Sequence, residues 1–122
     1  MASIDVSSSW CQGHIVVALG GELDICGAGH IGRALRAAAG SGSRIIVDLA
    51  ALSFIDCAGL AALASARRQA REAGGDLLLA AAARPVARLL SLTGELPLFA
   101  TVSEAASGDP RDPAAVGQPG DG

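Results

Sequence analysis

Two acidic residues and one cysteine are the side chains of this sequence best placed to do chemistry. Asp24 lies in the stretch GELD and Asp56 in the stretch FIDCAGL, where Cys57 follows directly. Each acid comes after an apolar run, so we expect it where a strand ends. Position 57 would then begin a helix, where unpaired backbone N–H groups and the helix dipole favour an anion. A hydroxyl there would suit a phosphoryl group, but position 57 carries a thiol.

Enzymatic uses of these residues are disfavoured. No neighbouring His, Lys or Tyr completes an acid–base mechanism for Asp24 and Asp56, and so small a fold leaves little room for a pocket. A Cys–His nucleophile at Cys57 is equally disfavoured, because His14 is expected at the opposite edge of the sheet and His30 inside a helix. The glycine-rich residues 20–29 lack the signature of a phosphate-binding loop. We therefore expect acids that cap helices and contact a partner, with no enzyme activity and no cofactor.

Four residues have a spacing that resembles zinc ligands, namely Cys11, His14, Cys26 and His30. If a strand runs from His14 to Glu22, its ends lie roughly 26 Å apart. Four ligands must surround one ion at bonding distance. The sequence therefore predicts no metal site from this set.

The hydropathy pattern predicts the elements that position these residues. Residues 14–19 and 44–49 are short, β-branched and almost continuously apolar, as in strands buried on both faces. Apolar residues at helical spacing follow each run. The predicted strands are residues 4–8, 14–19, 44–49, 76–82 and 98–102, and the predicted helices are residues 28–39, 57–73, 85–92 and a single turn at 103–106.

The resulting order, β-β-α-β-α-β-α-β, predicts an α/β fold. Right-handed crossovers place successive strands side by side in parallel, and residues 4–8 add an antiparallel edge. The sheet should have four to five mostly parallel strands packed by helices. Functional loops of such sheets lie at the carboxyl ends of the strands. Here these loops would be residues 20–29 and 54–59.

Composition sets the size and the class of the protein. The chain has 122 residues, 51% of them apolar and 2% aromatic, and a net charge of −3. Residues 1–106 suit one small domain, and residues 107–122, rich in Pro, Gly and Asp, suit a disordered acidic tail. A slightly acidic chain without Lys or Tyr does not fit nucleic-acid binding. Three cysteines and short apolar runs favour a cytoplasmic protein with no membrane insertion.

Several spaced motifs resemble the STAS domain of bacterial anti-sigma factor antagonists over about residues 10–106. They are GELD at residues 21–24, VDLAALSFIDCAGL at residues 47–60, an arginine cluster ahead of two glycines at residues 67–75, and LLSLTGELPLF at residues 89–99. The resemblance implies the STAS fold, a βα superhelix. It also implies a partner, an anti-sigma factor of the serine-kinase type, whose binding releases a sigma factor and so regulates transcription.

The resemblance also assigns roles to single residues. Asp24 and Asp56 match the two acids of the family motif, and Gly59 and Leu60 match the residues that open its second helix. The serine or threonine that the kinase phosphorylates falls on Cys57, so this chain is expected not to be phosphorylated there. The partner-binding residues implied are Gly21, Asp24, Ile25, Asp56, Cys57, Ala58, Gly59 and Leu60.

Two other functions stay open. In the first, oxidation of Cys57 replaces phosphorylation, and Cys26 is a candidate disulfide partner. A helix N-terminus favours the thiolate form of Cys57, whereas the two nearby carboxylates disfavour it. In the second, the chain is the STAS subunit of a transport or signalling complex. The arginines at positions 67, 68 and 71 are interpreted as a solvated helix end or as a contact for acids on a partner.

Overall fold

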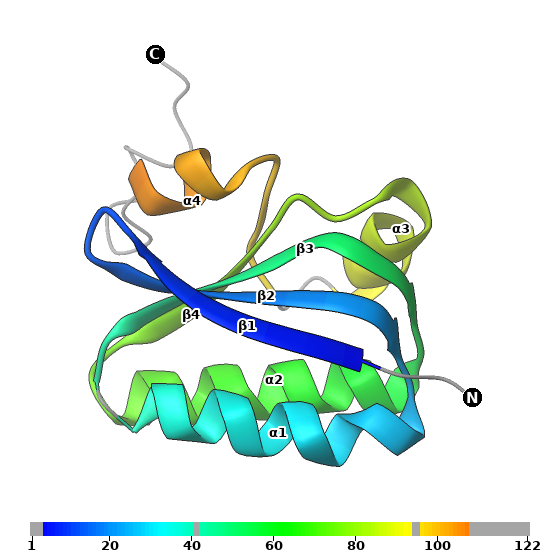
Figure 1. Ribbon diagram of the computed structural model, residues 1–122, viewed down its shortest axis with the longest axis horizontal. Helices are drawn as coiled ribbons and strands as arrows, with labels where there is room; N and C mark the ends of the chain where they lie inside the picture. Colours follow the sequence, from blue (N-terminus) through cyan, green and yellow to red (C-terminus); the bar gives the residue numbers. More distant parts are fainter. Residues whose placement is uncertain (1–3, 41, 94–95, 108–122) are drawn as a thin grey trace.

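A five-stranded sheet has helices packed on both of its faces (Figure 1). The computed structural model describes residues 4–40, 42–93 and 96–107, with Ile25, Cys26 and Thr93 described by their backbone alone. The strands are β1 (Ile4–Cys11), β2 (His14–Leu23), β3 (Arg44–Ile55), β4 (Asp76–Ala80) and β5 (Leu98–Phe99). The helices are α1 (Ile25–Ala39), α2 (Cys57–Glu72), α3 (Arg84–Thr93) and α4 (Val102–Ser107).

The strands lie in the sheet in the order in which they occur in the sequence. β1 pairs antiparallel with β2, and the remaining neighbours pair in parallel. β1 and β2 are joined by a two-residue turn in which Gln12 and Gly13 both have positive φ, 52° and 83°, as a tight hairpin requires. The predicted α/β class and the mostly parallel sheet are therefore confirmed.

Aliphatic side chains fill both faces of the sheet, as the scarcity of aromatic residues predicts. The larger cluster lies between the sheet and helices α1, α2 and α3, and a smaller one lies under α4. All five residues of β4 are buried. Because a central parallel strand is covered on both faces, continuous apolar runs correctly predicted where such strands lie.

The predicted functional loops at residues 20–29 and 54–59 are wrong in extent. β2 continues to Leu23 and β3 to Ile55, and α1 begins at Ile25 rather than at residue 28. β2 and β3 stay paired as far as Leu23 and Ile55, through two shifts in register. The pairing therefore continues past the small and polar residues that interrupt the apolar pattern in the sequence. Each loop is thereby reduced to a single residue, Asp24 in the first and Asp56 in the second.

The C-terminal elements also differ from the prediction. β5 ends at Phe99, and Val102 belongs to α4 instead. The hydroxyl of Thr101 accepts a hydrogen bond of 3.0 Å from the backbone N–H of Glu104, which stabilises the start of this six-residue helix. The predicted domain boundary at residue 106 falls within α4, and the tail predicted for residues 107–122 lies outside the described residues from 108 onward. No helix in the described ranges is long and apolar enough to cross a bilayer.

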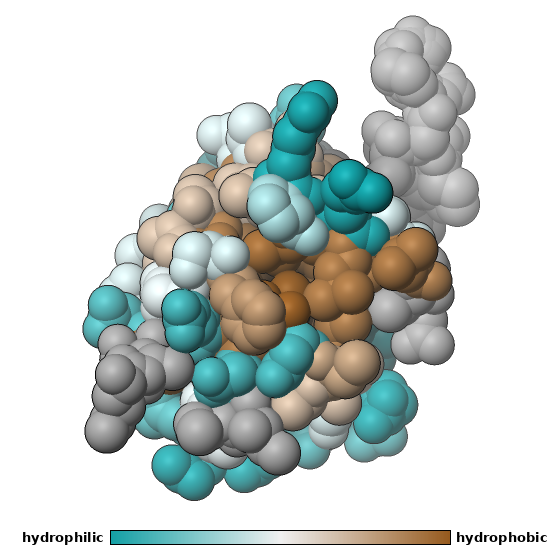
Figure 2. All heavy atoms as spheres, turned by 90° about the vertical axis from the view of Figure 1, so that its right-hand side faces the viewer, coloured by the Kyte–Doolittle hydropathy of each residue, from teal (hydrophilic) through white to brown (hydrophobic). Residues whose placement is uncertain are grey.

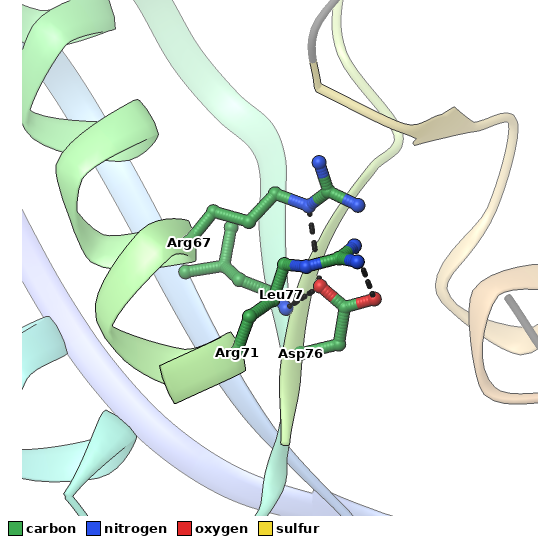
Figure 3. A network of polar contacts seen from close by, with 4 residues as sticks. All are labelled: Arg67, Arg71, Asp76 and Leu77. Atoms are coloured by element: carbon green, nitrogen blue, oxygen red, sulfur yellow. Dashed lines mark hydrogen bonds and ion pairs between the residues drawn. The ribbon is translucent and has the colours of Figure 1, made fainter. Parts of the chain in front are cut away.

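The arginine cluster of α2 binds a buried carboxylate within the same domain (Figure 3). Arg67 Nε donates to Asp76 Oδ1 at 3.1 Å, and Arg71 Nη1 lies 3.8 Å from Oδ2. The backbone N–H of Leu77 also donates to Oδ1, at 2.7 Å. The interpretation as a solvated helix end thus fits Arg68, which is exposed. It does not fit Arg67, whose partner Asp76 lies at the start of β4.

Candidate functional site

Two strand-to-helix junctions lie side by side at the carboxyl edge of the sheet. In the first, Asp24 alone joins β2 to α1, and in the second, Asp56 alone joins β3 to α2. Leu23 and Ile55, the last residues of the two strands, are partners in the sheet. The backbone N–H of Asp56 donates to the carbonyl oxygen of Leu23 at 3.2 Å. The two acids therefore occupy adjacent positions, as the parallel arrangement predicted.

Both acids cap the helix that follows. Asp24 Oδ1 accepts a hydrogen bond of 3.2 Å from the backbone N–H of Gly27, and Asp56 Oδ1 accepts one of 3.0 Å from that of Gly59. Asp56 has the extended backbone of an N-cap residue, with φ −118° and ψ −172°. The expectation that these acids cap helices is met by this geometry.

Glycines at the third position after each acid let the helix starts approach the sheet. A Cβ atom on Gly59 would lie 2.7 Å from both the carbonyl oxygen and Cγ of Leu23, and one on Gly27 would lie 3.1 Å from Cγ2 of Ile4. Each helix start therefore packs against the strand that precedes its own strand in the sheet. These two glycines were not predicted as part of the site, although the pattern Asp-x-x-Gly occurs in both DICG and DCAG.

Cys57 is the first residue of α2, and its free thiol is exposed. Ala58 beside it and Leu60 one turn on are half-buried. Ile25 and Cys26 form the start of α1 on the neighbouring junction, but their side chains lie outside the described part of the chain. The pairing of Cys26 with Cys57 therefore stays a prediction.

Gly21 lies close by, where β2 loses its regular register with β3. Its φ of 97° is one that side chains rarely adopt, so glycine is needed here. Its carbonyl oxygen accepts a hydrogen bond of 3.0 Å from the hydroxyl of Ser53 in β3. This contact ties the end of β2 to the strand that leads into the second junction.

Apolar side chains gather on the face that contains the two helix starts and α3, with polar side chains around them (Figure 2). Phe54, just before the second junction, is 47% exposed, and Leu92 of α3 is 80% exposed. Leu60 and Leu89 are half-buried, in contact with the core. An apolar patch with a polar rim is the usual composition of a protein-binding surface.

The cysteines and histidines of the suspected zinc pattern do not converge. Cys11 and His14 flank the β1–β2 turn, whereas Cys26 lies beyond the other end of β2 and His30 is exposed on α1. Among the described residues, no group of three or more side chains suits a metal ion. The length of β2 thus separates Cys11 and His14 from Cys26.

Comparison with known proteins identifies the fold. The sequence matches the STAS domain family over residues 11–105. No curated protein matches it significantly. Among solved structures, an anti-sigma factor antagonist from Mycobacterium paratuberculosis is 27% identical, with a TM-score of 0.69 over 84% of this chain and 91% of that one.

Two further solved proteins share the fold at lower identity. The anti-sigma factor antagonist SpoIIAA in its unphosphorylated form is 20% identical, with a TM-score of 0.65 over 85% of this chain and 94% of that one. Its phosphorylated form from Bacillus is 23% identical, with a TM-score of 0.64 over 83% of this chain and 96% of that one. The murine anion transporter Slc26a9 is 19% identical, with a TM-score of 0.65, and the match covers 78% of this chain but 17% of the transporter.

Proposed function

Because the chain belongs to the STAS domain family, we propose that it is an anti-sigma factor antagonist, which binds an anti-sigma factor of the serine-kinase type and so releases a sigma factor. Support comes from the antagonist of Mycobacterium paratuberculosis, which is 27% identical over 84% of this chain. In this proposal the protein acts in the cytoplasm as a binding module that regulates transcription, with no catalytic step of its own.

The observation that carries the proposal is the pair of Asp-capped junctions with Cys57 exposed on the second. The proposed docking surface consists of Gly21, Asp24, Ile25, Asp56, Cys57, Ala58, Gly59 and Leu60. It is rigid, because strand pairing, two caps and the hydrogen bond from Asp56 to Leu23 fix its backbone. A preorganised surface loses little conformational entropy on binding.

Cys57 determines how the complex is regulated in this proposal. A serine kinase transfers the γ-phosphoryl group of ATP to a hydroxyl, and the exposed residue at the start of α2 offers a thiol instead. The chain would then stay in its binding-competent form whatever the supply of ATP. Release of the partner would depend on another signal.

Binding of the purified protein to serine-kinase-type anti-sigma factors tests the proposal. Isothermal titration should show a complex that Cys57→Asp weakens by at least about tenfold, since the new charge must be desolvated in the interface. The matched control is Gln12→Asp, which adds the same charge at the exposed β1–β2 turn, where Asp tolerates the left-handed backbone. No binding, or an equal loss in both variants, would contradict the proposal.

A second candidate function is a STAS subunit in a transport complex, supported by the match to part of Slc26a9. The same two variants separate the functions. A transporter captured from the membrane fraction by the wild type, lost with Cys57→Asp and kept with Gln12→Asp, would favour this second function if no anti-sigma factor binds.

A further inference from the structure

A buried imidazole at the β1–β2 turn plays no part in the proposed docking surface. His14 is only 7% exposed. Its Nδ1 lies 3.2 Å from the carbonyl oxygen of Gln12, and because a carbonyl only accepts, Nδ1 must carry the ring proton. Nε2 then holds a lone pair, and it is buried without a hydrogen-bond partner among the described residues.

Cys11 lies directly across the hairpin from His14. The two residues are strand partners on either side of the two-residue turn. Side chains of such partners project from the same face of the sheet, with Cβ atoms about 5 Å apart. Cys11 is a free, half-buried thiol that packs against the cluster under α4. Since Nδ1 donates to the turn carbonyl, Nε2 is the ring nitrogen that remains available to bind another group.

This arrangement is typical of a metal ligand. A histidine that binds a metal usually donates its other ring N–H to a backbone carbonyl or carboxylate, which fixes the tautomer and the ring orientation. Thiolate and imidazole together favour soft metal ions, copper(I) among them. Copper(I) is the ion that fits two ligands, because zinc would need four and the described residues offer no third side chain here.

We propose that Cys11 and His14 form a binding site for copper(I). On binding, the Sγ–H bond of Cys11 breaks, its proton passes to solvent, and copper bonds to Sγ and to Nε2 of His14. The oxidation state of copper does not change, and no reductant is consumed by the step. Metal–ligand bonds of about 2 Å would hold Sγ and Nε2 roughly 4 Å apart, and the Cβ atoms of such a strand pair lie about 5 Å apart. The half-buried thiol provides the path of entry.

The site differs from the four-residue zinc pattern in the sequence. His14 and Leu23 mark opposite ends of β2, roughly 30 Å apart at the rise of a strand. Cys57 lies at the Leu23 end, so metal bound at Cys11 and metal bound at the docking surface can be distinguished by substitution. Copper binding at this turn does not depend on the proposed docking function.

Competition for copper(I) against bicinchoninate in ascorbate tests the site on the full chain. The wild type should take up one equivalent, Cys11→Ser should lose it, and His14→Gln should bind at least about tenfold more weakly. Cys57→Ser is the matched control and should bind like the wild type. Uptake that is unchanged in Cys11→Ser, or lost in Cys57→Ser, would overturn the proposal.

Because His14 is buried, its substitution could disturb the fold, so a second measurement uses the wild type. In ¹⁵N spectra of the imidazole rings, one equivalent of copper(I) should shift Nε2 of His14 and leave the exposed His30 unchanged. An unshifted His14, or equal shifts of both rings, would overturn the assignment.

Discussion

The backbone N–H of Asp56 donates a hydrogen bond of 3.2 Å to the carbonyl oxygen of Leu23, which joins the second strand-to-helix junction to the first. Leu23 is also the residue that leaves no room for a side chain at Gly59. One strand end therefore positions both the start of α2 and the cap that precedes it. The proposed docking surface depends on this contact between two junctions that are far apart in the sequence.

Gly59→Ala should destabilise the domain by about 1–3 kcal/mol, or more if the backbone of β2 cannot shift. The added Cβ would meet a backbone oxygen and two buried side chains at under 3 Å. Gly29→Ala is the matched control, because its nearest neighbour is the flexible end of Arg33 at 3.8 Å, and Ala favours the helix. Urea unfolding should show opposite signs for the two variants, and equal losses would contradict the packing described.

Asp56→Ala should lower the free energy of unfolding by about 1 kcal/mol, because α2 loses its N-cap. Asp56→Asn keeps an oxygen that accepts from Gly59 and should unfold nearly like the wild type. Binding of the anti-sigma factor should nevertheless weaken in Asp56→Asn if the charge contacts the partner. Thermal unfolding together with titration separates the two roles, and an Asn variant as unstable as the Ala variant would argue against the cap.

Asp76→Ala should cost about 1–3 kcal/mol in the free energy of unfolding. The change removes the carboxylate that binds Arg67 and Arg71 and leaves the backbone N–H of Leu77 without its acceptor. Arg68→Ala, on the exposed side of the same helix, should change stability by no more than about 0.5 kcal/mol. Chemical unfolding of both variants tests this, and a harmless Asp76→Ala would show that the contacts are not stabilising.

Oxidation of Cys57 is the alternative prediction for how the docking surface is regulated. If Cys57 forms a disulfide with Cys26, peroxide should weaken partner binding and a thiol reductant should restore it. Peptide mapping without reductant should then find the Cys26–Cys57 linkage. Cys26→Ser should abolish the linkage but not the binding. Free thiols at both positions after peroxide would exclude this switch.

Local sequence patterns predicted the order of the strands and helices. Contacts between residues distant in the sequence determine where each strand and helix begins and ends. The apolar runs at residues 14–19 and 44–49 located β2 and β3, because central parallel strands are buried on both faces. Their extension to Leu23 and Ile55 depends on pairing across two register shifts, which no local pattern encodes. The predicted loops were too long for that reason.

The candidate site was likewise predictable only in part. The positions of Asp24 and Asp56 followed from strand order and from the capping preference of Asp. The need for glycine at position 59 follows only from the approach of α2 to Leu23, a residue far away in the sequence. The partner of Arg67 could not be read from its helix either, since Asp76 belongs to β4.

The response of the complex to ATP tests the central claim most directly. Wild-type protein bound to a serine-kinase-type anti-sigma factor should stay bound after MgATP is added, because Cys57 offers no hydroxyl. Cys57→Ser should gain one phosphate, detected by intact-protein mass spectrometry, and dissociate. Release of the wild type by ATP, or a Cys57→Ser variant that binds but is never phosphorylated, would contradict the claim that Cys57 occupies the regulatory position.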